Sequence, residues 1–297
     1  MGGAALAVPP PFWGIVWAVI QRPFRQVGLA LVAAALLAVA PGTARAAEPP
    51  VFDAHLHYSR NAWAEHPPEA VFALMDRAGV RRAFVSSTPD DGTIRLYDLA
   101  PERIVPVLRP YRESGDLGGW HRDSTVVGYL EARLQRRVYR GIGEFHLSGT
   151  DAESPVVREV AELARRHGLF LHCHCDAEAV ETLLSLGANV TVLWAHAGMS
   201  AGPDVVGALI DRFPRLLVEL ALRSDVAPGG QLDPAWRALF LRHPDRFMIG
   251  TDTWIPSRWP ELPAVQDAAR AWLAQLPPDV ARRLAWSNAE RLAAGGP

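Results

Sequence analysis

The sequence contains no lysine, and all 30 of its basic residues are arginines. A mechanism that depends on a lysine amine is therefore excluded. Charge of one sign is also lacking, because 32 acidic residues nearly balance the arginines. Such a balance indicates neither a nucleic-acid surface nor a polybasic membrane patch. We expect the partner to be a small-molecule substrate, with no nucleic acid.

Cysteine is scarce, and Cys173 and Cys175 in the segment LHCHC are the only two. An exported protein could hold them as a disulfide. Residues i and i+2 of one strand, however, are poorly placed for disulfide geometry. We therefore predict two buried free thiols.

The apolar run at residues 27–40 has about 14 residues and is shorter than the ~20 that a membrane-spanning helix needs. It follows the arginines of QRPFRQ and precedes Ala44-Arg45-Ala46, an A-x-A cleavage pattern. We predict that residues 1–46 are a secretory signal peptide and that the mature protein is periplasmic or secreted, without stable membrane insertion. A second apolar patch upstream, FWGIVWAVI, leaves open that this region holds the chain at the membrane.

Cleavage would leave residues 47–297, close to the ~250 residues of a single (β/α)8 barrel. Short apolar runs alternate there with longer helical patterns, which is typical of repeated βα units. No glycine-rich phosphate turn follows the first run, and this disfavours an open doubly wound sheet. The predicted fold is therefore α/β, a single-domain TIM barrel. We place its eight strands at residues 51–57, 81–87, 104–110, 139–146, 169–175, 191–197, 216–222 and 247–253.

The first predicted strand leads into the segment VFDAHLHY, which carries two histidines one residue apart. Side chains alternate along a strand, so we expect His55 and His57 to share a face, with Asp53 below them. Two imidazoles on one face make half of a metal site. A strand end that merely exposes two histidines is the alternative.

The same alternation turns other ionisable side chains toward the barrel interior. This interior is normally packed with branched apolar residues, so inward charges near the strand C-termini indicate an active site. Buried charge also needs a counter-charge, for which a divalent cation is the simplest choice. The predicted inward positions are Ile142, Glu144 and His146; Phe170, His172 and His174; Trp194 and His196; Glu219 and Arg223; Gly250 and Asp252. The positions predicted to face the helices include Phe52, Leu56, Leu171, Cys173, Leu193, Leu220 and Ile249.

Some of the inward residues have more than one interpretation. We prefer His174 as a ligand over His172, which lies one pleat deeper. His146, at a strand end, is open between a substrate contact, a ligand and a solvated loop residue. Glu219 and Arg223 could simply pair with each other.

Five segments, taken in order, resemble the metal-dependent amidohydrolase superfamily. DAHLHY resembles the HxH of its first strand, HCHCD its fifth-strand histidine, WAHAG its sixth-strand histidine, GTDTW its eighth-strand aspartate and WSNAERL its closing Asn-Ala motif. The resemblance covers essentially the whole mature chain and implies that His55, His57 and Asp252 bind a first metal ion. It implies that His174 binds the first or a second ion, and that His196 is a ligand or polarises the substrate.

Two branches of the superfamily are similar to the chain. The amidohydrolase-related branch contains lactonases, other hydrolases and non-oxidative decarboxylases of carboxylated small molecules, and typically holds one metal. The TatD-type nuclease branch carries a fourth-strand glutamate, which GIGEFH supplies as Glu144. Because a carboxylated lysine is excluded, only Glu144 could bridge two ions. We favour the first branch, since export and the lack of a basic groove argue against DNA as substrate.

The resemblance and the ligand set together predict a divalent metal cofactor. Zinc is preferred, with manganese or iron as alternatives, held by His55, His57, His174 and Asp252, with Glu144 at or beside the site. We expect hydrolysis of a lactone, amide or ester bond in a small anionic molecule by metal-activated water. Asp252 would carry the proton, and His196 could stabilise the oxyanion.

Substrate contacts are predicted from residues near the strand ends. Arg223 and Arg109 are expected to pair with a substrate carboxylate, and Trp254 and Tyr58 to wall the pocket. The alternative functions are a non-oxidative decarboxylase of the same fold, a TatD-like phosphodiesterase, and a catalytically inactive periplasmic binding protein.

Overall fold

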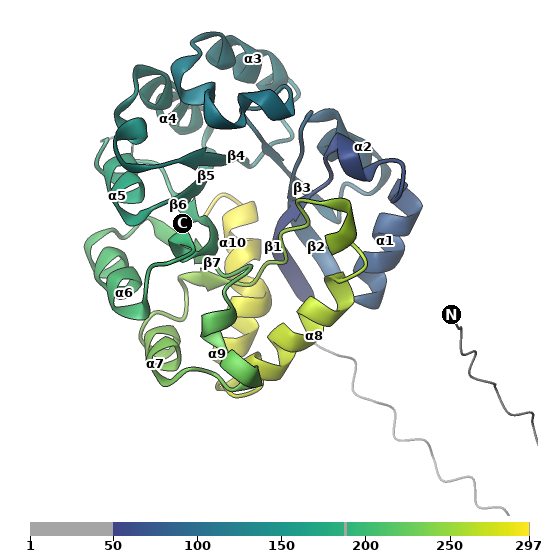
Figure 1. Cartoon of the computed structure of the whole chain (residues 1–297), viewed down its shortest axis with the longest axis vertical. Helices are drawn as coiled ribbons and strands as arrows, with labels where there is room; N and C mark the ends of the chain where they lie inside the picture. Colours follow the sequence, from purple (N-terminus) through teal and green to yellow (C-terminus); the bar gives the residue numbers. More distant parts are fainter. Residues whose placement is uncertain (1–49, 187–188, 297) are drawn as a thin grey trace, which may run out of the picture. The chain divides into compact units, whose positions relative to one another are not determined.

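The computed structural model describes residues 50–186 and 189–296. Eight parallel strands pair in sequence order (Figure 1). The two ends of the sheet meet where the Ala54 N–H donates to the Ile249 carbonyl (2.9 Å) and the Asp252 N–H donates to the His55 carbonyl (2.7 Å). The predicted (β/α)8 barrel is thereby confirmed. The strands are β1 (Val51–His57), β2 (Val80–Ser86), β3 (Ile104–Leu108), β4 (Gly141–Leu147), β5 (Phe170–Cys175), β6 (Val192–Trp194), β7 (Leu216–Glu219) and β8 (Phe247–Met248).

Helices surround the barrel, and several begin at a proline, which is preorganised for the first helical turn. Side-chain caps fix other starts: Ser154 accepts from the Val156 N–H, and Asp176 accepts from the Ala179 N–H. The helices are α1 (Pro68–Arg77), α2 (Asp91–Leu99), α3 (Thr125–Leu134), α4 (Pro155–His167), α5 (Ala177–Ser185), α6 (Pro203–Arg212), α7 (Pro234–Arg242), α8 (Leu262–Leu273), α9 (Pro278–Arg282) and α10 (Asn288–Ala293). Short helical turns include η1 (Arg60–Ala62), η2 (Ser114–Gly118), η5 (Ala195–Gly198) and η9 (Arg283–Ser287).

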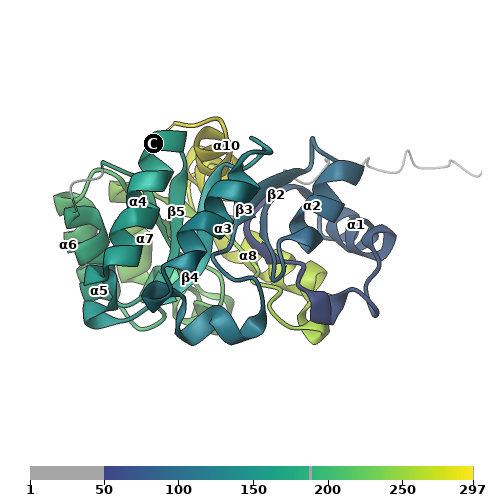
Figure 2. The same ribbon diagram turned by 90° about the horizontal axis from the view of Figure 1, so that it is seen from above.

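The apolar core has two parts. The larger part lies between the strands and the surrounding helices, and the smaller part fills one end of the barrel interior. Figures 1 and 2 show α10 closing that end, which is the end where the strands begin. The smaller cluster consists of Phe52, Ala54, Phe84, Val105, Val107, Phe170, Leu193, Leu217 and Met248 from the strands, with Ala289, Leu292 and Ala293 from α10. Only the end where the strands finish is thus free for polar groups.

Strand β1 departs from the predicted alternation. Asp53 faces Ala83 of β2, but Leu56 faces Val85, so β1 has one extra residue in this stretch. Phe52 therefore points into the barrel, whereas Asp53 points outward and binds Thr251 and Gln266. The prediction that Asp53 lies below His55 and His57 on one face was wrong, as was the outward assignment of Phe52.

Strand β4 contains a similar irregularity, because Gly143 pairs with His172 while Phe145 already pairs with Cys173. Ile142 consequently packs outward in the larger core, which corrects its predicted inward position. Gly143 has a φ of +138°, and a Cβ at this position would overlap the His172 carbonyl. Only glycine fits this close approach of β4 to β5.

Strand β6 reverses the predicted faces of its two last residues. Leu193 joins the interior cluster, and Trp194 packs outward with its indole N–H donating to the Cys175 carbonyl (2.7 Å). The chain then leaves strand geometry, since His196 and Ala197 have positive φ values of 56° and 46°. His196 reaches the interior through this turn and not through alternation.

The cysteines also differ from the prediction, because Cys173 and Cys175 form a disulfide. Their Cα atoms are 5.6 Å apart, within the range that a disulfide spans. Both side chains are buried on the outer face of β5, on either side of the inward-pointing His174. Free thiols were expected from average strand spacing, which does not hold at this strand end.

Within residues 50–186 and 189–296, no helix is long and apolar enough to cross a membrane. The predicted signal peptide, residues 1–46, and the predicted start of the mature protein lie outside the described residues.

Candidate active site

His55, His57 and His196 lie at the end of the barrel where the strands finish. Each ring is held by a hydrogen bond at its Nδ1 atom. In each, Nδ1 faces an oxygen that carries no proton: His55 faces the Glu219 carboxylate (2.8 Å), His57 the Ser86 carbonyl (2.9 Å) and His196 the Ala221 carbonyl (3.0 Å). The Ser86 hydroxyl also lies 3.0 Å from His57 Nδ1, and its oxygen can accept from the same N–H. An acceptor at Nδ1 places the ring proton there. In their neutral form, the three rings therefore present lone pairs at Nε2.

These Nε2 atoms converge on two carboxylates. His57 Nε2 lies 3.0 Å from His55 Nε2, 3.0 Å from Glu144 Oε2 and 3.3 Å from Asp252 Oδ1. His196 Nε2 lies 3.5 Å from Glu144 Oε1 and 3.7 Å from Asp252 Oδ2. Lone pairs and anionic oxygens facing one another at such distances repel unless a cation lies among them. The donor set, imidazoles with carboxylates, is the one that zinc and related ions prefer.

Two atoms at this position lack hydrogen-bond partners among the described residues. They are His196 Nε2 and Asp252 Oδ1, and both are buried. Burying polar atoms without a partner is costly, so their orientation toward a common point needs an explanation. A divalent cation would satisfy both, and the residues present therefore fit a metal ion.

When no metal ion is bound, a proton on His55 supplies positive charge at this position. Burial would raise the pKa of Asp252 and Glu144, yet the nearby His55 charge and hydrogen bonds from histidines hold both pKa values below their usual range. Burial would likewise lower the pKa of His55, but Glu144, Asp252 and Glu219 raise it well above its usual value. The carboxylates thus attract positive charge to the position where the Nε2 atoms meet.

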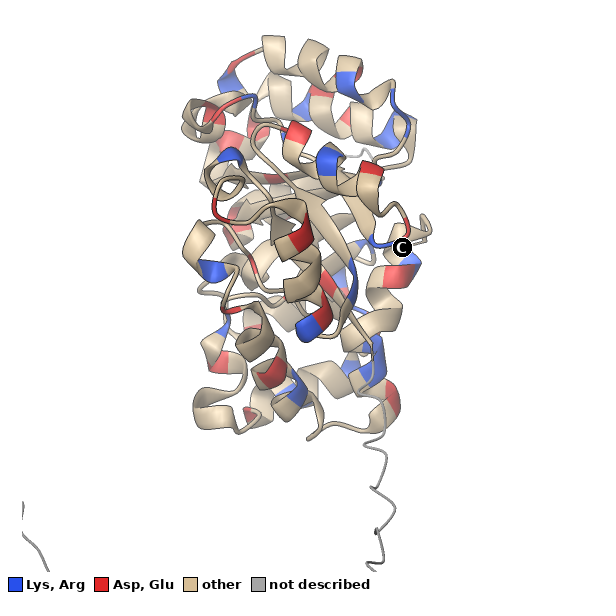
Figure 3. Ribbon diagram, turned by 90° about the vertical axis from the view of Figure 1, so that its right-hand side faces the viewer, with Lys and Arg blue, Asp and Glu red and all other residues tan. Residues whose placement is uncertain are grey.

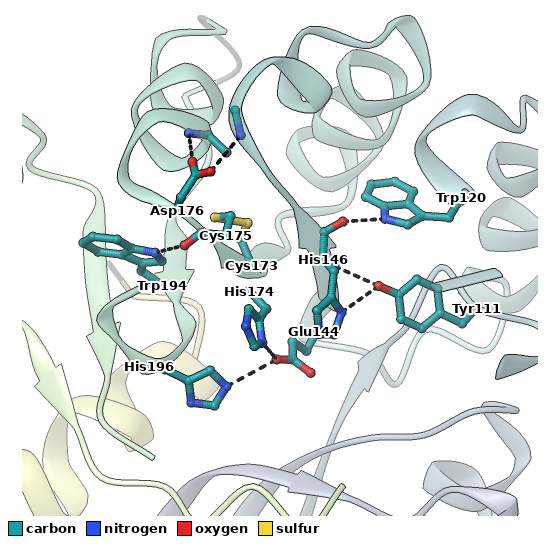
Figure 4. Close-up of a disulfide and its surroundings, with 12 residues drawn as sticks. Tyr111, Trp120, Glu144, His146, Cys173, His174, Cys175, Asp176, Trp194 and His196 are labelled. Carbon is teal, nitrogen blue, oxygen red and sulfur yellow. Dashed lines mark hydrogen bonds and ion pairs between the residues drawn. A yellow bond between two sulfur atoms is a disulfide. The ribbon is translucent and has the colours of Figure 1, made fainter. Parts of the chain in front are cut away.

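A second group of side chains lies beside the first (Figure 4). His174 Nδ1 is 3.0 Å from Glu144 Oε1, and the His174 ring stacks on His146 with centroids 4.3 Å apart. His146 also contacts Tyr111, and burial lowers its pKa to about 4. Glu144 therefore contacts both groups, and its Oε1 lies near both His174 (3.0 Å) and His196 (3.5 Å). His172 lies deeper, against the His55 ring, with its Nε2 unpartnered among the described residues.

A cavity of about 590 Å³ opens above these groups. Arg109 lines it, and its guanidinium donates to the Glu144 carbonyl (2.9 Å) and the Glu144 carboxylate (3.2 Å). Trp254 also lines the cavity and is 54% exposed. The remaining lining residues are Ser59, Arg60, Asn61, Thr88, Tyr111, Ser114, Leu117, Glu144, His146, His174, Leu222, Asp252 and Ile255.

Tyr58 and Arg223, which were predicted to contact substrate, lie elsewhere. Tyr58 is fully buried, and its hydroxyl donates to the His66 carbonyl (2.9 Å). Arg223 pairs with Asp225 and donates to the carbonyls of His196 (3.0 Å), Ala197 (3.1 Å) and Ala201 (2.8 Å). Arg223 therefore holds the turn that carries His196, and neither residue lines the cavity.

Sequence reasoning missed three functional features of this site. Glu219 was predicted to face inward, with Arg223 as a possible partner, whereas in the structure it contacts His55. The position of Tyr111, two residues beyond Arg109 near the end of β3, was a usable signal, because alternation gives both the same face. The role of His146 had been left open.

The fold and the site define a (β/α)8 barrel with a histidine and carboxylate centre at the strand ends. The family model described as amidohydrolase matches residues 121–292, which is more than half of the chain. The protein therefore belongs to the amidohydrolase family. Members of this family typically bind divalent metal ions, and the clusters described above are suited to hold them. No curated protein matched the sequence.

Solved structures with the same fold include a putative 2-pyrone-4,6-dicarboxylic acid hydrolase from Pseudomonas putida. It is 14% identical, covers 84% of this chain and 98% of its own, and has a TM-score of 0.61. A probable hydrolase of the same acid from Acinetobacter baumannii, with bound citric acid, is 12% identical, with 82% and 99% covered and a TM-score of 0.58. An amidohydrolase from Burkholderia multivorans with bound zinc is 15% identical, with 82% and 99% covered and a TM-score of 0.54. At these low sequence identities, the comparison shows that the chains share a fold.

Proposed function

We propose that the protein is a metal-dependent hydrolase of a carbonyl-type bond, a lactone, amide or ester, in a small anionic molecule. The observation that carries the proposal is the set of three imidazoles, each with Nδ1 occupied, whose Nε2 atoms meet Asp252 and Glu144 below an open cavity. Family membership supports the same chemistry.

The metal ion would be held by His55, His57 and Asp252, with Glu144 at or beside the site. His174 and His196 would bind a second ion or complete the first. Zinc is the preferred ion for these nitrogen and oxygen donors, with manganese and iron as alternatives. A divalent cation bound there would lower the pKa of water toward ~7 and polarise a carbonyl oxygen.

Side chains of this protein would carry out proton transfer and complete the binding of the metal ion. Asp252 lines the cavity, where its carboxylate would take a proton from water and return it to the leaving group. His196 is fully buried and offers a lone pair, so it suits a ligand better than an oxyanion donor. The sequence motif had left His196 open between a metal ligand and a group that polarises the substrate, and we propose the ligand role.

The cavity supports a small substrate with negative charge. Its volume of about 590 Å³ lies in the range of small-molecule sites. Arg109 supplies positive charge beside Glu144, and Trp254 supplies an apolar wall. Two structural neighbours are named as hydrolases of a dicarboxylic acid, which agrees with an anionic substrate. Figure 3 shows arginines and acidic residues interspersed over the helices on one side of the molecule, and this mixed charge supports a small-molecule substrate over a nucleic acid.

Metal analysis of protein purified without added metal or chelator tests the first part. We expect about one equivalent or more of zinc or a related ion. Less than about half an equivalent, not restored by added zinc, would refute metal dependence and favour a barrel that only binds its ligand.

A substrate screen tests the reaction. Metal-loaded protein is offered lactones, amides, esters, phosphodiesters and aromatic acids, and Asp252→Asn is compared with Asp267→Asn on the exposed side of α8. We expect hydrolysis of a carbonyl compound, reduced ~10²–10⁴-fold in Asp252→Asn alone. Carbon dioxide release without hydrolysis would indicate a decarboxylase, and phosphodiester cleavage a TatD-like activity.

We also propose that residues 1–46 direct export and are removed. The Cys173–Cys175 disulfide supports an oxidising compartment such as the periplasm. Intact mass and cell fractionation in the native host test the proposal. A full-length chain in the membrane fraction would instead indicate a tethered enzyme.

A further inference from the structure

His146 lies at the end of β4 and lines the cavity, yet the metal-binding arrangement described above does not need it. Its ring stacks on His174 on one side and contacts Tyr111 on the other (Figure 4). The question is which of its two ring nitrogens carries the proton, because this decides whether His146 accepts or donates toward the cavity.

The Tyr111 hydroxyl determines which ring nitrogen of His146 carries the proton. Its oxygen accepts the backbone N–H of His146 (2.8 Å) and lies 3.0 Å from His146 Nδ1. Tyr111 is only 1% exposed, and among the described residues its O–H has no other acceptor than His146 Nδ1. The hydroxyl therefore donates to Nδ1, and the proton of a neutral imidazole must then reside on Nε2.

This is the opposite arrangement to that of His55, His57 and His196. Those rings carry the proton on Nδ1 and offer an Nε2 lone pair, as a metal ligand must. His146 instead offers an Nε2–H. This atom makes no hydrogen bond within residues 50–186 and 189–296, and it is not among the enclosed polar atoms. Its N–H is thus open to the cavity.

We propose that His146 is a catalytic hydrogen-bond donor, whose Nε2–H binds the substrate oxygen that gains negative charge when its carbonyl is attacked. Tyr111 is its positioning residue, because it fixes the ring proton on Nε2. His146 lies beside the centre, since its ring stacks on His174 and it lines the same cavity as Glu144 and Asp252. The proton stays on His146, so the contact is electrostatic and involves no transfer.

The inference rests on the proposed function for the nature of the substrate, but the tautomer of His146 does not. Nitrogen-15 NMR of histidine-labelled protein measures the tautomer directly. We expect an Nε2–H signal for His146 in the wild type and a mixture of tautomers in Tyr111→Phe. Tyr139→Phe, which removes a buried tyrosine hydroxyl outside the cavity, should leave His146 unchanged. An Nδ1–H signal in the wild type would overturn the proposal.

Binding of phenylphosphonate, a tetrahedral anion, tests the role of the donor. We expect His146→Asn to weaken binding about tenfold, because one hydrogen bond to an anion is lost. His146→Gln should retain most of the affinity, since its amide N–H reaches the position of Nε2. Metal content should equal that of the wild type in both variants. Equal affinity in all three proteins, or loss of metal from His146→Asn, would refute the donor role. If the wild-type protein bound no metal and hydrolysed no substrate, the proposed function would be refuted. The tautomer of His146 in that protein would still test the inference about His146.

Discussion

The contact between Glu219 and His55 offers the sharpest test of the metal centre. Glu219 is fully buried, and no arginine pairs with it within the described part of the chain. It accepts the Nδ1–H of His55 at 2.8 Å and the N–H of Ala221. Gly250 makes room for it, because a Cβ there would overlap the Glu219 carboxylate. A carboxylate behind a ligating histidine fixes the ring and makes its other nitrogen more basic.

Glu219→Gln removes the charge and keeps the size, so His55 should become a weaker ligand. Loss of such an outer partner typically costs 10–100-fold in metal affinity, or about 1.4–2.7 kcal/mol of binding free energy. Competition with a fluorescent zinc chelator measures the affinity, and circular dichroism checks the fold. The matched control is Glu290→Gln, which removes a charge that pairs with Arg82 far from the site. A zinc affinity within about threefold of the wild type would refute the reasoning.

Three further predictions follow from contacts outside the metal centre. Arg223→Met should lower the free energy of unfolding in urea by about 2–3 kcal/mol and weaken metal binding through His196, because three backbone carbonyls lose their donor; a raised KM as the main effect would return Arg223 to the substrate. Trp254→Ala should raise KM a few-fold and leave stability within about 0.5 kcal/mol, since the side chain is 54% exposed. Burial raises the pKa of Asp90 from 3.8 to about 6, so the folded state favours its neutral form. Stability should therefore fall by up to about 3 kcal/mol as the pH rises from about 4 to about 6, and Asp90→Asn should abolish this loss; a parallel pH profile of the two proteins would contradict it.

The sequence predicted the barrel, which the structure confirms, and it predicted most of the side chains that meet at the strand ends. The strand order and the inward positions of His55, His57, Glu144 and His174 were predicted from periodicity, because buried parallel strands have a strong apolar pattern. Asp252 was predicted within the eighth strand, but β8 ends at Met248 and Asp252 lies beyond it with a φ of 58°. What alternation could not reveal is a change of phase. A single extra residue in a strand moves every later side chain to the opposite face of the sheet. No residue type in β1 indicates that such an extra residue is present.

Contacts between distant segments were the other gap. Glu219 and Arg223 are near in sequence and opposite in charge, so pairing them was reasonable. In the fold, His55 approaches Glu219 from β1, and Arg223 turns away toward the carbonyls around His196. The disulfide is a similar case, since its formation depends on the local geometry at the end of β5 and not on average strand spacing.

The two irregular strands explain how one barrel can have both an apolar floor and a polar mouth. Strict alternation would force a choice in β1: with Phe52 and Ala54 inside, His55 would face the helices. The extra residue allows Phe52 to pack against α10 while His55 and His57 both reach the centre. In β4 the same device brings Glu144 inward after Gly143. Because these shifts place the ligands, a change that restored regular pairing should abolish metal binding while leaving the barrel folded.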